Sequence, residues 1–281
     1  METIYTVRKG TIELDSYSDF IYIWFWGDVH RDSKSCDSDR WKGFLRKSAK
    51  DPPEKTWYFG LGDYHDFASD REQKKLMREG YALHEDTVEN IHELVEKRNR
   101  KFASEIKQMN GKLLGLIDGN HNWRFPNGVT ASEDLANRMG CDHLGWITHY
   151  TITLKYLNHQ MPIDIVACHG KGGGKRAGAS VNQVEDLTDI FQAADIYVMG
   201  HDHKLWAYPK DILLRVNGEI KQKTQYLCRS GSFKKAYSPD KSGYEIGRLL
   251  KPATLGALKV RVGIERHRNP DRLVPDIEIT V

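Results

Sequence analysis

The chain has 281 residues, of which 39% are hydrophobic, and this is enough to form one large domain or two small ones around a packed core. Its 42 Lys and Arg residues nearly balance 39 Asp and Glu residues, giving a formal net charge of +3. The balance excludes the strong positive field of a protein that coats nucleic acid, so any attraction to phosphate must be local.

Cysteine usage and apolar runs bear on the cellular compartment. The four cysteines are widely separated and form no C-x-x-C pair, which favours a reducing cytoplasm. The first residues, METIYTVRKG, lack the basic and apolar regions of a signal peptide, and no apolar run approaches the roughly 20 residues of a membrane span. We therefore expect a soluble, cytoplasmic protein with no membrane partner.

Short runs of β-branched and aromatic residues recur along the chain, and each ends in Gly, Asp, Asn or His. This pattern is typical of buried strands that open into polar loops. The five strand-loop segments are 21–30, 56–66, 112–121, 163–170 and 196–203. Helical patterns alternate with them, at about 39–50, 70–109, 132–139 and 181–193. The alternation predicts an α/β fold.

We expect a single domain over residues 1–281, with a helical insertion at about 69–109 and a β-rich C-terminal part at about 207–281. The insertion is either an ordinary cover helix on the sheet, a cap over the cleft or a dimer face. In the C-terminal part, extended patterns lie at 212–216, 224–229, 258–262 and 277–281. These strands are expected to complete a second sheet. The sequence leaves the oligomeric state open.

Ligand-type side chains follow all five predicted strands, and loops at the carboxyl ends of strands in an α/β sheet converge on one crevice. Asp28 and His30 stand two apart, so on an extended backbone both would lie on the same side. A mixture of carboxylate, amide and imidazole donors suits Mn²⁺, Fe or Zn²⁺ better than Ca²⁺ or Mg²⁺. The ligand-type side chains at these strand ends are Asp28, His30, Asp63, His65, Asp66, Asn120, His121, His169, His201, Asp202 and His203.

Two cations need a shared ligand, because a carboxylate can bridge metals that lie roughly 3.5–4 Å apart. Asp63 is the candidate for this bridge. A glycine stands directly before a ligand at Gly62, Gly119 and Gly200, where the missing Cβ would let the backbone approach the metals closely. We expect bulk at these positions to abolish activity.

Taken in order, these motifs resemble the signature of the calcineurin-like metallophosphoesterase superfamily, which is D-x-H, G-D-x-x-D, G-N-H-[DE], a lone His and G-H-x-H. The matching segments span about residues 21–203, and each follows an apolar strand. The resemblance implies a four-layer α/β/β/α sandwich of two mixed sheets, with a dinuclear site at one edge. It also implies hydrolysis of a phosphate ester by a hydroxide that bridges the two metals, without a covalent phosphoenzyme.

The resemblance also assigns roles to individual residues. One metal would be held by Asp28, His30, Asp63 and His203. The other would be held by Asp63, Asn120, His169 and His201. His121 would be the catalytic histidine beside the leaving oxygen, and it would ligate neither metal. The metals are expected to be Mn, with Fe or Zn as alternatives.

One position departs from the family pattern, because an acid usually follows the catalytic histidine and this chain has Asn122. We expect Asn122 to orient the imidazole of His121 as an acceptor, while stabilising its charged form less well than a carboxylate. A weaker proton donor would favour substrates with good leaving groups. Alternatively, Asp118 or Asp66 would serve as the acid.

Substrate contacts are sought in the cationic segments after the ligands. Lys171, Lys175 and Arg176 follow His169 in a glycine-rich loop that would offer positive charge and backbone N–H groups to phosphate; the alternative is a solvated connection. Arg229 ends a late strand and either reaches the cleft or belongs to a turn.

Fold and ligands do not decide the substrate. We expect a phosphodiester of single-stranded nucleic acid or of a nucleotide, since basic segments flank the ligands. The alternatives are a phosphomonoesterase, acting on a protein or a small molecule, and a scaffold without catalytic activity.

Overall fold

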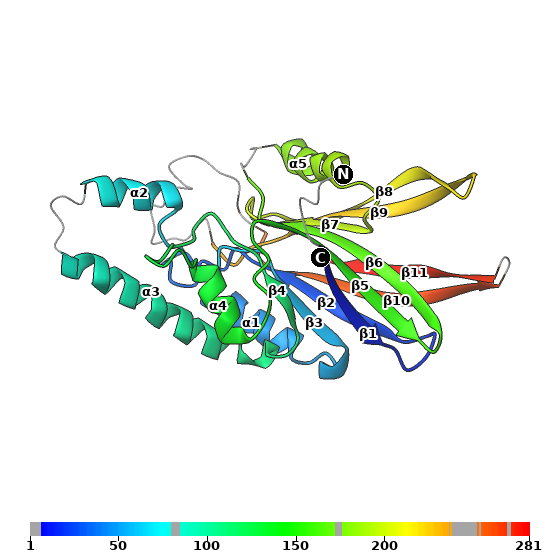
Figure 1. Cartoon of the computed structure of the whole chain (residues 1–281), viewed down its shortest axis with the longest axis horizontal. Helices are drawn as coiled ribbons and strands as arrows, with labels where there is room; N and C mark the ends of the chain where they lie inside the picture. Colours follow the sequence, from blue (N-terminus) through cyan, green and yellow to red (C-terminus); the bar gives the residue numbers. More distant parts are fainter. Residues whose placement is uncertain are drawn as a thin grey trace.

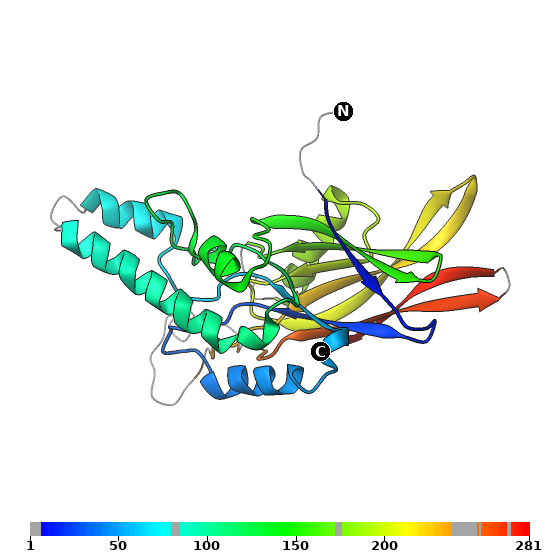
Figure 2. The same cartoon turned by 60° about the horizontal axis from the view of Figure 1, so that its bottom comes forward.

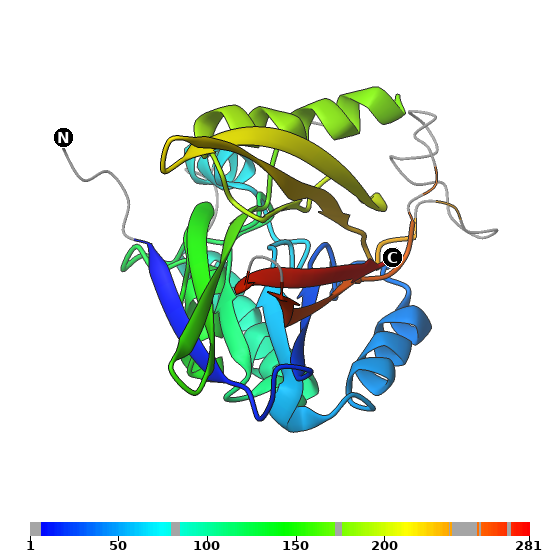
Figure 3. The ribbon, with the colours of Figure 1, turned by 90° about the vertical axis from the view of Figure 1, so that its right-hand side faces the viewer.

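The computed structural model describes residues 7–79, 85–171, 176–235, 237, 252, 254–268 and 271–281. Two β-sheets pack face to face, and helices cover their outer faces (Figure 1). An end-on view shows one helix above the pair of sheets and another on the opposite side (Figure 3). The predicted α/β fold with two mixed sheets is confirmed.

The first sheet has six strands in the order β1-β5-β6-β7-β9-β8. Their bounds are β1 Arg8–Glu13, β5 Ile147–Tyr156, β6 His159–Cys168, β7 Ile196–Met199, β8 Leu205–Val216 and β9 Glu219–Ser230. The central strands β6, β7 and β9 run parallel, whereas β5 and β8 pair antiparallel with their neighbours β6 and β9. This sheet is therefore mixed, with parallel strands at its centre.

The second sheet has five strands in the order β11-β10-β2-β3-β4. Their bounds are β2 Phe20–Trp26, β3 Thr56–Gly60, β4 Leu113–Leu116, β10 Leu258–Arg268 and β11 Asp271–Thr280. Strands β2, β3 and β4 are parallel, and β10 pairs antiparallel with both β2 and β11. All three parallel strands carry a candidate ligand in the loop that follows.

The sequence of β2 explains why it lies in the middle of the layers. Ile21, Ile23 and Phe25 point to the core between the two sheets, whereas Trp24 and Trp26 point to the core under the helices. All five side chains are almost completely buried. A strand that is buried on both faces needs a continuous apolar run, which this segment supplies.

Five α-helices lie within the described residues, with 3-10 turns at Pro53–Lys55 and Lys107–Met109. The helices are α1 Ser38–Ser48, α2 Asp70–Glu79, α3 Glu85–Glu105, α4 Ala131–Met139 and α5 Ala177–Ile190. Helices α1, α3 and α4 cover the five-stranded sheet and α5 covers the six-stranded sheet. Among the described residues, no helix is long and apolar enough to cross a membrane.

Three expectations from the sequence need correction. The C-terminal strands do not complete one sheet, because β8 and β9 join the six-stranded sheet and β10 and β11 join the other. The patterns had not predicted β1 and β5, which lie at one edge of the six-stranded sheet. The described residues of the long helical stretch form α2, α3 and a 3-10 turn, and α2 and α3 project from the sheets at the end away from hairpins β8–β9 and β10–β11 (Figure 2).

Candidate metal centre

The loops after β2, β3, β4, β6 and β7 meet at one edge of the two sheets and bring the candidate ligands together. Carboxylates and imidazoles there form close groups, in each of which the ligand atoms lie within 4.8 Å of one another. One group is Asp28, His30 and His203, and another is Asp63, His169 and His201. The residues could therefore hold metal ions.

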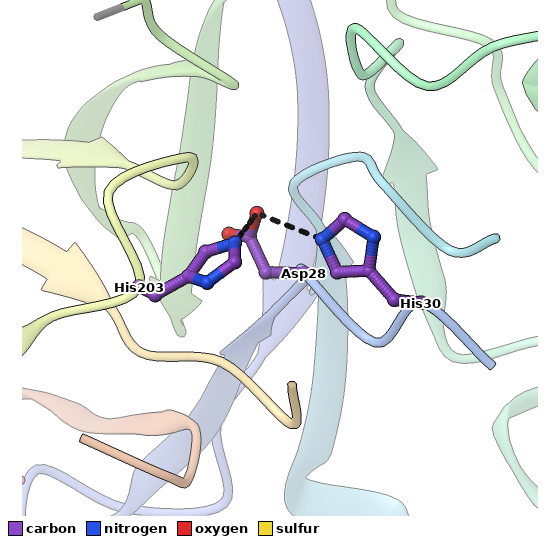
Figure 4. A group of neighbouring side chains, drawn as sticks. All are labelled: Asp28, His30 and His203. Carbon is purple, nitrogen blue, oxygen red and sulfur yellow. Dashed lines mark ion pairs between the residues drawn. The ribbon is translucent and has the colours of Figure 1, made fainter. Parts of the chain in front are cut away.

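The first group is centred on the carboxylate of Asp28 (Figure 4). Its Oδ1 atom lies 3.3 Å from Nε2 of His203 and 3.9 Å from Nε2 of His30. Asp28 and His30 are 0% and 1% exposed, yet Oδ1 of Asp28 and Nε2 of His30 make no hydrogen bond. Unpaired polar atoms are unfavourable in a protein interior. A cation bound between these atoms would satisfy both, so the donor set fits a metal.

The second group surrounds the amide oxygen of Asn120. Asn120 Oδ1 lies 2.9 Å from Nε2 of His169 and 2.7 Å from Nδ1 of His201, and these two ring nitrogens are 3.2 Å apart. Oδ2 of Asp63 lies 3.3 Å from the same nitrogen of His169. One carboxylate, one amide oxygen and two imidazoles thus converge on one point.

Asp63 connects the two groups. Its Oδ2 atom lies 3.8 Å from Nε2 of His30 in the first group and 3.3 Å from Nε2 of His169 in the second. Its Oδ1 atom accepts a hydrogen bond from the backbone N–H of His121 at 2.9 Å. The side chain is therefore held in place by one oxygen and faces both groups with the other.

The backbone of the centre departs from the extended conformation expected for Asp28 and His30. Strand β2 ends at Trp26, and the two residues then have φ values of 47° and 46°. Asp63, His201 and His203 are also left-handed, at 47°, 74° and 58°. Left-handed backbone is unfavourable for residues other than glycine and tends to occur at functional sites. Loop conformation, not strand alternation, aims these side chains inward.

The glycines allow the loops to approach one another closely, as predicted. A Cβ at Gly119 would overlap the carboxylate of Asp63, and one at Gly200 would lie 2.9 Å from Oδ2 of Asp28. At Gly62, where φ is 88°, a Cβ would lie 2.8 Å from the backbone of Gly119. Side chains at these positions would push the loops apart.

Hydrogen bonds at the far ring nitrogens orient two of the histidines. Nδ1 of His30 lies 2.8 Å from Oδ1 of Asp66, and Nδ1 of His169 lies 2.7 Å from the carbonyl oxygen of Leu61. Because both partners are acceptors, each Nδ1 carries a proton and donates it. Nε2 of each ring then faces the centre as a candidate ligand, as in many metal sites.

Burial and neighbouring charges separate the pKa values of two imidazoles. Burial opposes protonation of His169, but the charge of Asp63 outweighs it and raises the pKa of His169 to about 9. Burial, together with the positive charge of His169, lowers the pKa of His201 to about 4. Burial works against ionisation of Asp63, but His169 and His30 hold its pKa well below its usual range. The carboxylate of Asp63 is therefore ionised at neutral pH.

His121 lies beside the centre, and its side chain is 29% exposed. Its Nδ1 atom lies 3.1 Å from the carbonyl oxygen of Phe67 and 3.6 Å from Oδ1 of Asp66. A carbonyl only accepts hydrogen bonds, so Nδ1 donates its proton to Phe67 and leaves Nε2 for another partner.

The expectation that Asn122 orients His121 is wrong. The side chain of Asn122 is buried, and its Nδ2 donates to Asp118 at 2.6 Å while its Oδ1 accepts from the backbone of Ser132 at 3.0 Å. Both polar ends are thus engaged elsewhere. The acid that lies near the imidazole is Asp66, which the pattern G-D-x-x-D includes.

Asp118 and Asp66 do not suit the role of a proton donor at neutral pH. Burial opposes ionisation of Asp118, but His143 lowers its pKa overall, and Oδ1 accepts from Asn122 and Thr130. Burial likewise opposes ionisation of Asp66, and its hydrogen bond with His30 lowers its pKa well below the usual range. Both carboxylates are ionised and can only accept protons.

The predicted substrate contacts fall in different places. Lys171 and Arg176 are exposed, and Lys175 lies outside the described residues. Arg229 is completely buried; it donates to the carbonyl oxygen of Gly200 and to Oε1 of Gln183 at 2.7 Å. A buried guanidinium cannot contact a substrate, so that prediction for Arg229 is wrong. Arg229 instead supports the loop that carries His201.

The segment that follows Arg229 contacts both Asp28 and Asp66. Oγ of Ser232 donates to the carbonyl oxygen of Asp28 at 3.0 Å, and the N–H of Phe233 donates to the same oxygen at 2.9 Å. Nζ of Lys234 lies 3.4 Å from Oδ1 of Asp66. The Ser-Phe-Lys stretch has no ligand motif, and the sequence marks it only as the end of a late strand, which is β9 of the six-stranded sheet.

No family model matches the chain, and no curated protein sequence matches it. Solved structures are similar to it at low scores. Vacuolar protein sorting 29 from Cryptosporidium parvum is 13% identical with a TM-score of 0.37, covering 93% of this chain and 98% of that one. A double mutant of the same protein from Entamoeba histolytica is 12% identical with a TM-score of 0.37, covering 92% and 99%.

A third similar structure is a conserved uncharacterized protein from Streptococcus pneumoniae, described as a predicted phosphoesterase. It is 12% identical with a TM-score of 0.35, and the match covers 92% of this chain and 98% of that one. Similarity at this level bears on neither activity nor substrate. The function must be inferred from the chain's own site.

Proposed function

We propose that the chain is a calcineurin-like metallophosphoesterase that hydrolyses a phosphodiester of nucleic acid or of a nucleotide with two divalent cations. One observation carries the proposal: two groups of ligand-type side chains from five loops converge, and Asp63 faces both. The order of the motifs along the chain supports the same conclusion. Chance clustering would not also leave Oδ1 of Asp28 and Nε2 of His30 buried and unpaired.

In this proposal the ligands divide as the two groups do. Asp28, His30 and His203 hold one cation and Asn120, His169 and His201 the other, while Asp63 serves both. Bound cations would activate a water nucleophile and neutralise charge on the phosphoryl oxygens. Mn²⁺ is the favoured ion, and Fe or Zn²⁺ also suits these oxygen and nitrogen donors.

His121 is proposed to act on the substrate directly. Its Nδ1 proton is committed to Phe67, and one ring nitrogen lies within 4.8 Å of ligand atoms of His30 and Asp63. When the ring is protonated, Nε2 can donate a proton to the leaving oxygen or stabilise its developing charge. Oδ1 of Asp66 lies 3.6 Å from Nδ1, so a carboxylate faces the other ring nitrogen.

The preference for a phosphodiester rests on cationic side chains around the centre. Lys171 and Arg176 are exposed close in sequence to His169, and they are proposed to bind phosphates that flank the reacting one. A phosphomonoesterase would have no use for such flanking contacts. A non-catalytic scaffold would not need the full set of ligands, which this chain retains.

The test is a substrate panel with protein that has been freed of metal and reloaded with Mn²⁺. The panel contains p-nitrophenyl phosphate, bis(p-nitrophenyl) phosphate, cyclic nucleotides and single-stranded DNA. We expect diesters to be cleaved with a higher kcat/KM than the monoester. Faster cleavage of the monoester would indicate a phosphomonoesterase, and the absence of hydrolysis with any transition metal would indicate a scaffold.

A further inference from the structure

A second feature lies directly beside the candidate metal centre. A cavity of about 170 Å³ shares Gly119 and Asn120 with the centre, and its other walls include Arg71, Arg124 and Trp146. Pockets for whole small molecules measure roughly 300–1,000 Å³, so this cavity suits one part of a larger substrate. Whatever occupies it lies next to the side chain of Asn120.

Trp146 is the aromatic wall of the cavity, and 51% of its surface is exposed. The loop that carries it is held against β4 by backbone hydrogen bonds. The N–H of Leu144 donates to Leu116 at 2.9 Å, and the N–H of Asp118 donates to Gly145 at 2.8 Å. A large aromatic side chain on an anchored loop, left exposed beside a site, is suited to stacking on a ligand ring.

Two arginines provide the cationic wall. Arg71 lies in the first turn of α2, and Arg124 follows the loop of His121. A reciprocal pair of hydrogen bonds joins these elements, since Nε2 of Gln73 donates to the carbonyl oxygen of Arg124 at 2.6 Å and the N–H of Arg124 donates to Oε1 of Gln73 at 3.2 Å. The helical insertion therefore supplies one wall of the cavity.

The acids near the cavity are already engaged. Asp118 lines it, but its Oδ1 accepts from Asn122 and Thr130 and lies 3.0 Å from Nε2 of His143. Oε2 of Glu72 accepts from the backbone and the hydroxyl of Ser69, at 2.8 and 2.7 Å. Arg71 and Arg124 are exposed, and within the part of the chain that the structure describes neither forms an ion pair with these acids; Nη1 of Arg124 donates to the carbonyl oxygen of Gly128 at 2.8 Å.

We propose that this cavity is a subsite for one nucleotide unit next to the reacting phosphate, with the base stacked on Trp146 and a phosphate contacted by Arg71 and Arg124. The inference rests on the proposed function, because it names the substrate of the same centre. Stacking on an aromatic side chain tolerates any base, and guanidinium groups in the wall of a cavity favour phosphate oxygens. The unit belongs to a free nucleotide or to a single strand of nucleic acid.

The test measures binding and therefore does not depend on turnover. Thymidine 5′-monophosphate and deoxyribose 5-phosphate differ only by the base, and calorimetric titration of the Mn²⁺-treated protein gives a Kd for each. We expect the nucleotide to bind about 10-fold more tightly, as expected for one stacked base. Trp146→Ala should reduce the ratio of the two Kd values to about one, and Trp146→Phe should retain most of it.

Matched variants separate a specific contact from a general surface effect. Tyr208 is 54% exposed on β8, away from the cavity, and Tyr208→Ala should leave the ratio unchanged. Arg71→Ala should weaken both ligands equally, by about 10-fold, because it removes a phosphate contact. Arg40 is exposed on α1, and Arg40→Ala should weaken neither.

The subsite is overturned if the wild type binds the nucleotide and the sugar phosphate with nearly equal Kd values. It is also overturned if Trp146→Ala leaves the ratio of the two Kd values unchanged. A normal ratio in a protein that hydrolyses no diester supports the subsite and rejects the proposed function. Hydrolysis of diesters by a protein whose two Kd values are nearly equal rejects the subsite and supports the proposed function. A short thymidine oligonucleotide identifies the source: tighter binding than the mononucleotide assigns a single strand, and equal binding assigns a free nucleotide.

Discussion

The candidate centre and the β8–β9 hairpin both contain left-handed backbone outside glycine, but for different reasons. At the hairpin, Asn217 and Gly218 have φ values of 51° and 83°, and Asn-Gly is the sequence that such tight turns favour. At the centre, the left-handed residues include Asp28, His30 and Asp63, whose side chains are buried. There the conformation is unfavourable and the surrounding contacts must maintain it.

The burial of polar and apolar side chains is also reversed between the two regions. At the hairpin, Leu213 and Ile220 are 72% and 67% exposed. At the centre, Asp28 and His30 are almost completely buried, and atoms of both lack hydrogen bonds. Folding alone favours the opposite arrangement. The side chains of the centre are therefore placed as a cation site requires, whereas those of the hairpin follow turn geometry alone.

The largest expected difference in activity is between variants of Asp63 at the candidate centre and of Asp211 on the β8–β9 hairpin. Asp63→Ala removes the side chain that faces both groups, so activity should fall by at least about 1,000-fold. Asp211 accepts a hydrogen bond from Thr224 on the hairpin at 2.6 Å, and Asp211→Ala should leave activity within about two-fold of the wild type, as for other distant surface changes. Steady-state kinetics and metal content would be compared. Equal losses in the two variants would contradict the comparison.

Glycine substitutions give the next largest difference. In Gly119→Ala the new Cβ overlaps the carboxylate of Asp63, and overpacking of this kind costs about 3 kcal/mol of unfolding free energy. In Gly218→Ala the Cβ meets nothing within 4 Å, so only the strain of the left-handed φ remains, at about 1 kcal/mol. Urea unfolding measures both. A Gly119→Ala variant as stable as the wild type would contradict the close approach of Gly119 to Asp63.

A smaller effect is expected for the residue that orients His30. Asp66→Asn retains the shape but loses the charge that faces Nδ1 at 2.8 Å, and such changes typically weaken metal affinity by about 10- to 100-fold. Competition with a chelator of known affinity measures the change. Asp32→Asn is a useful control, because Asp32 accepts from the backbone of Asp66 at 2.6 Å without facing His30. An unchanged affinity in Asp66→Asn would show that His30 needs no orienting acid.

The smallest effect depends on pH and lies beside the centre. Burial opposes protonation of His143, but Asp118, at 3.0 Å, outweighs it and raises the pKa of His143 above 6.5. A raised pKa stabilises the folded state fully below the unfolded value, and the stabilisation is lost as pH rises through the folded value. His143→Gln should therefore destabilise the protein more at about pH 5.5 than at about pH 8.5. Urea unfolding at both pH values checks the sign, and a larger effect at high pH would contradict it.

The sequence predicted the parts of the molecule that depend on local patterns of residues. Apolar runs predicted β2, β3, β4, β6 and β7, and the helical patterns located α1, α4 and α5 to within a few residues. Ligand-type residues after each strand predicted a common site, because parallel strands end at the same edge. The close approach at Gly119 also followed from the sequence.

Features that depend on tertiary contacts were not predictable. Strand β1 is half-polar and lies at a sheet edge, so only its pairing with β5 identifies it. The amide of Asn122 was expected to face His121, but the fold brings it to Asp118 and Ser132 instead. Arg229 could be assigned to the cleft or to the interior only once the loop of Gly200 was placed.

The central claim is that two cations bind where the two groups meet at Asp63. Titration of metal-free protein with Mn²⁺, followed by calorimetry and elemental analysis, tests it most directly. We expect two Mn²⁺ per chain in the wild type and fewer than two in Asp63→Ala. Failure of the wild type to bind any transition metal, or two ions still bound in Asp63→Ala, would contradict the claim.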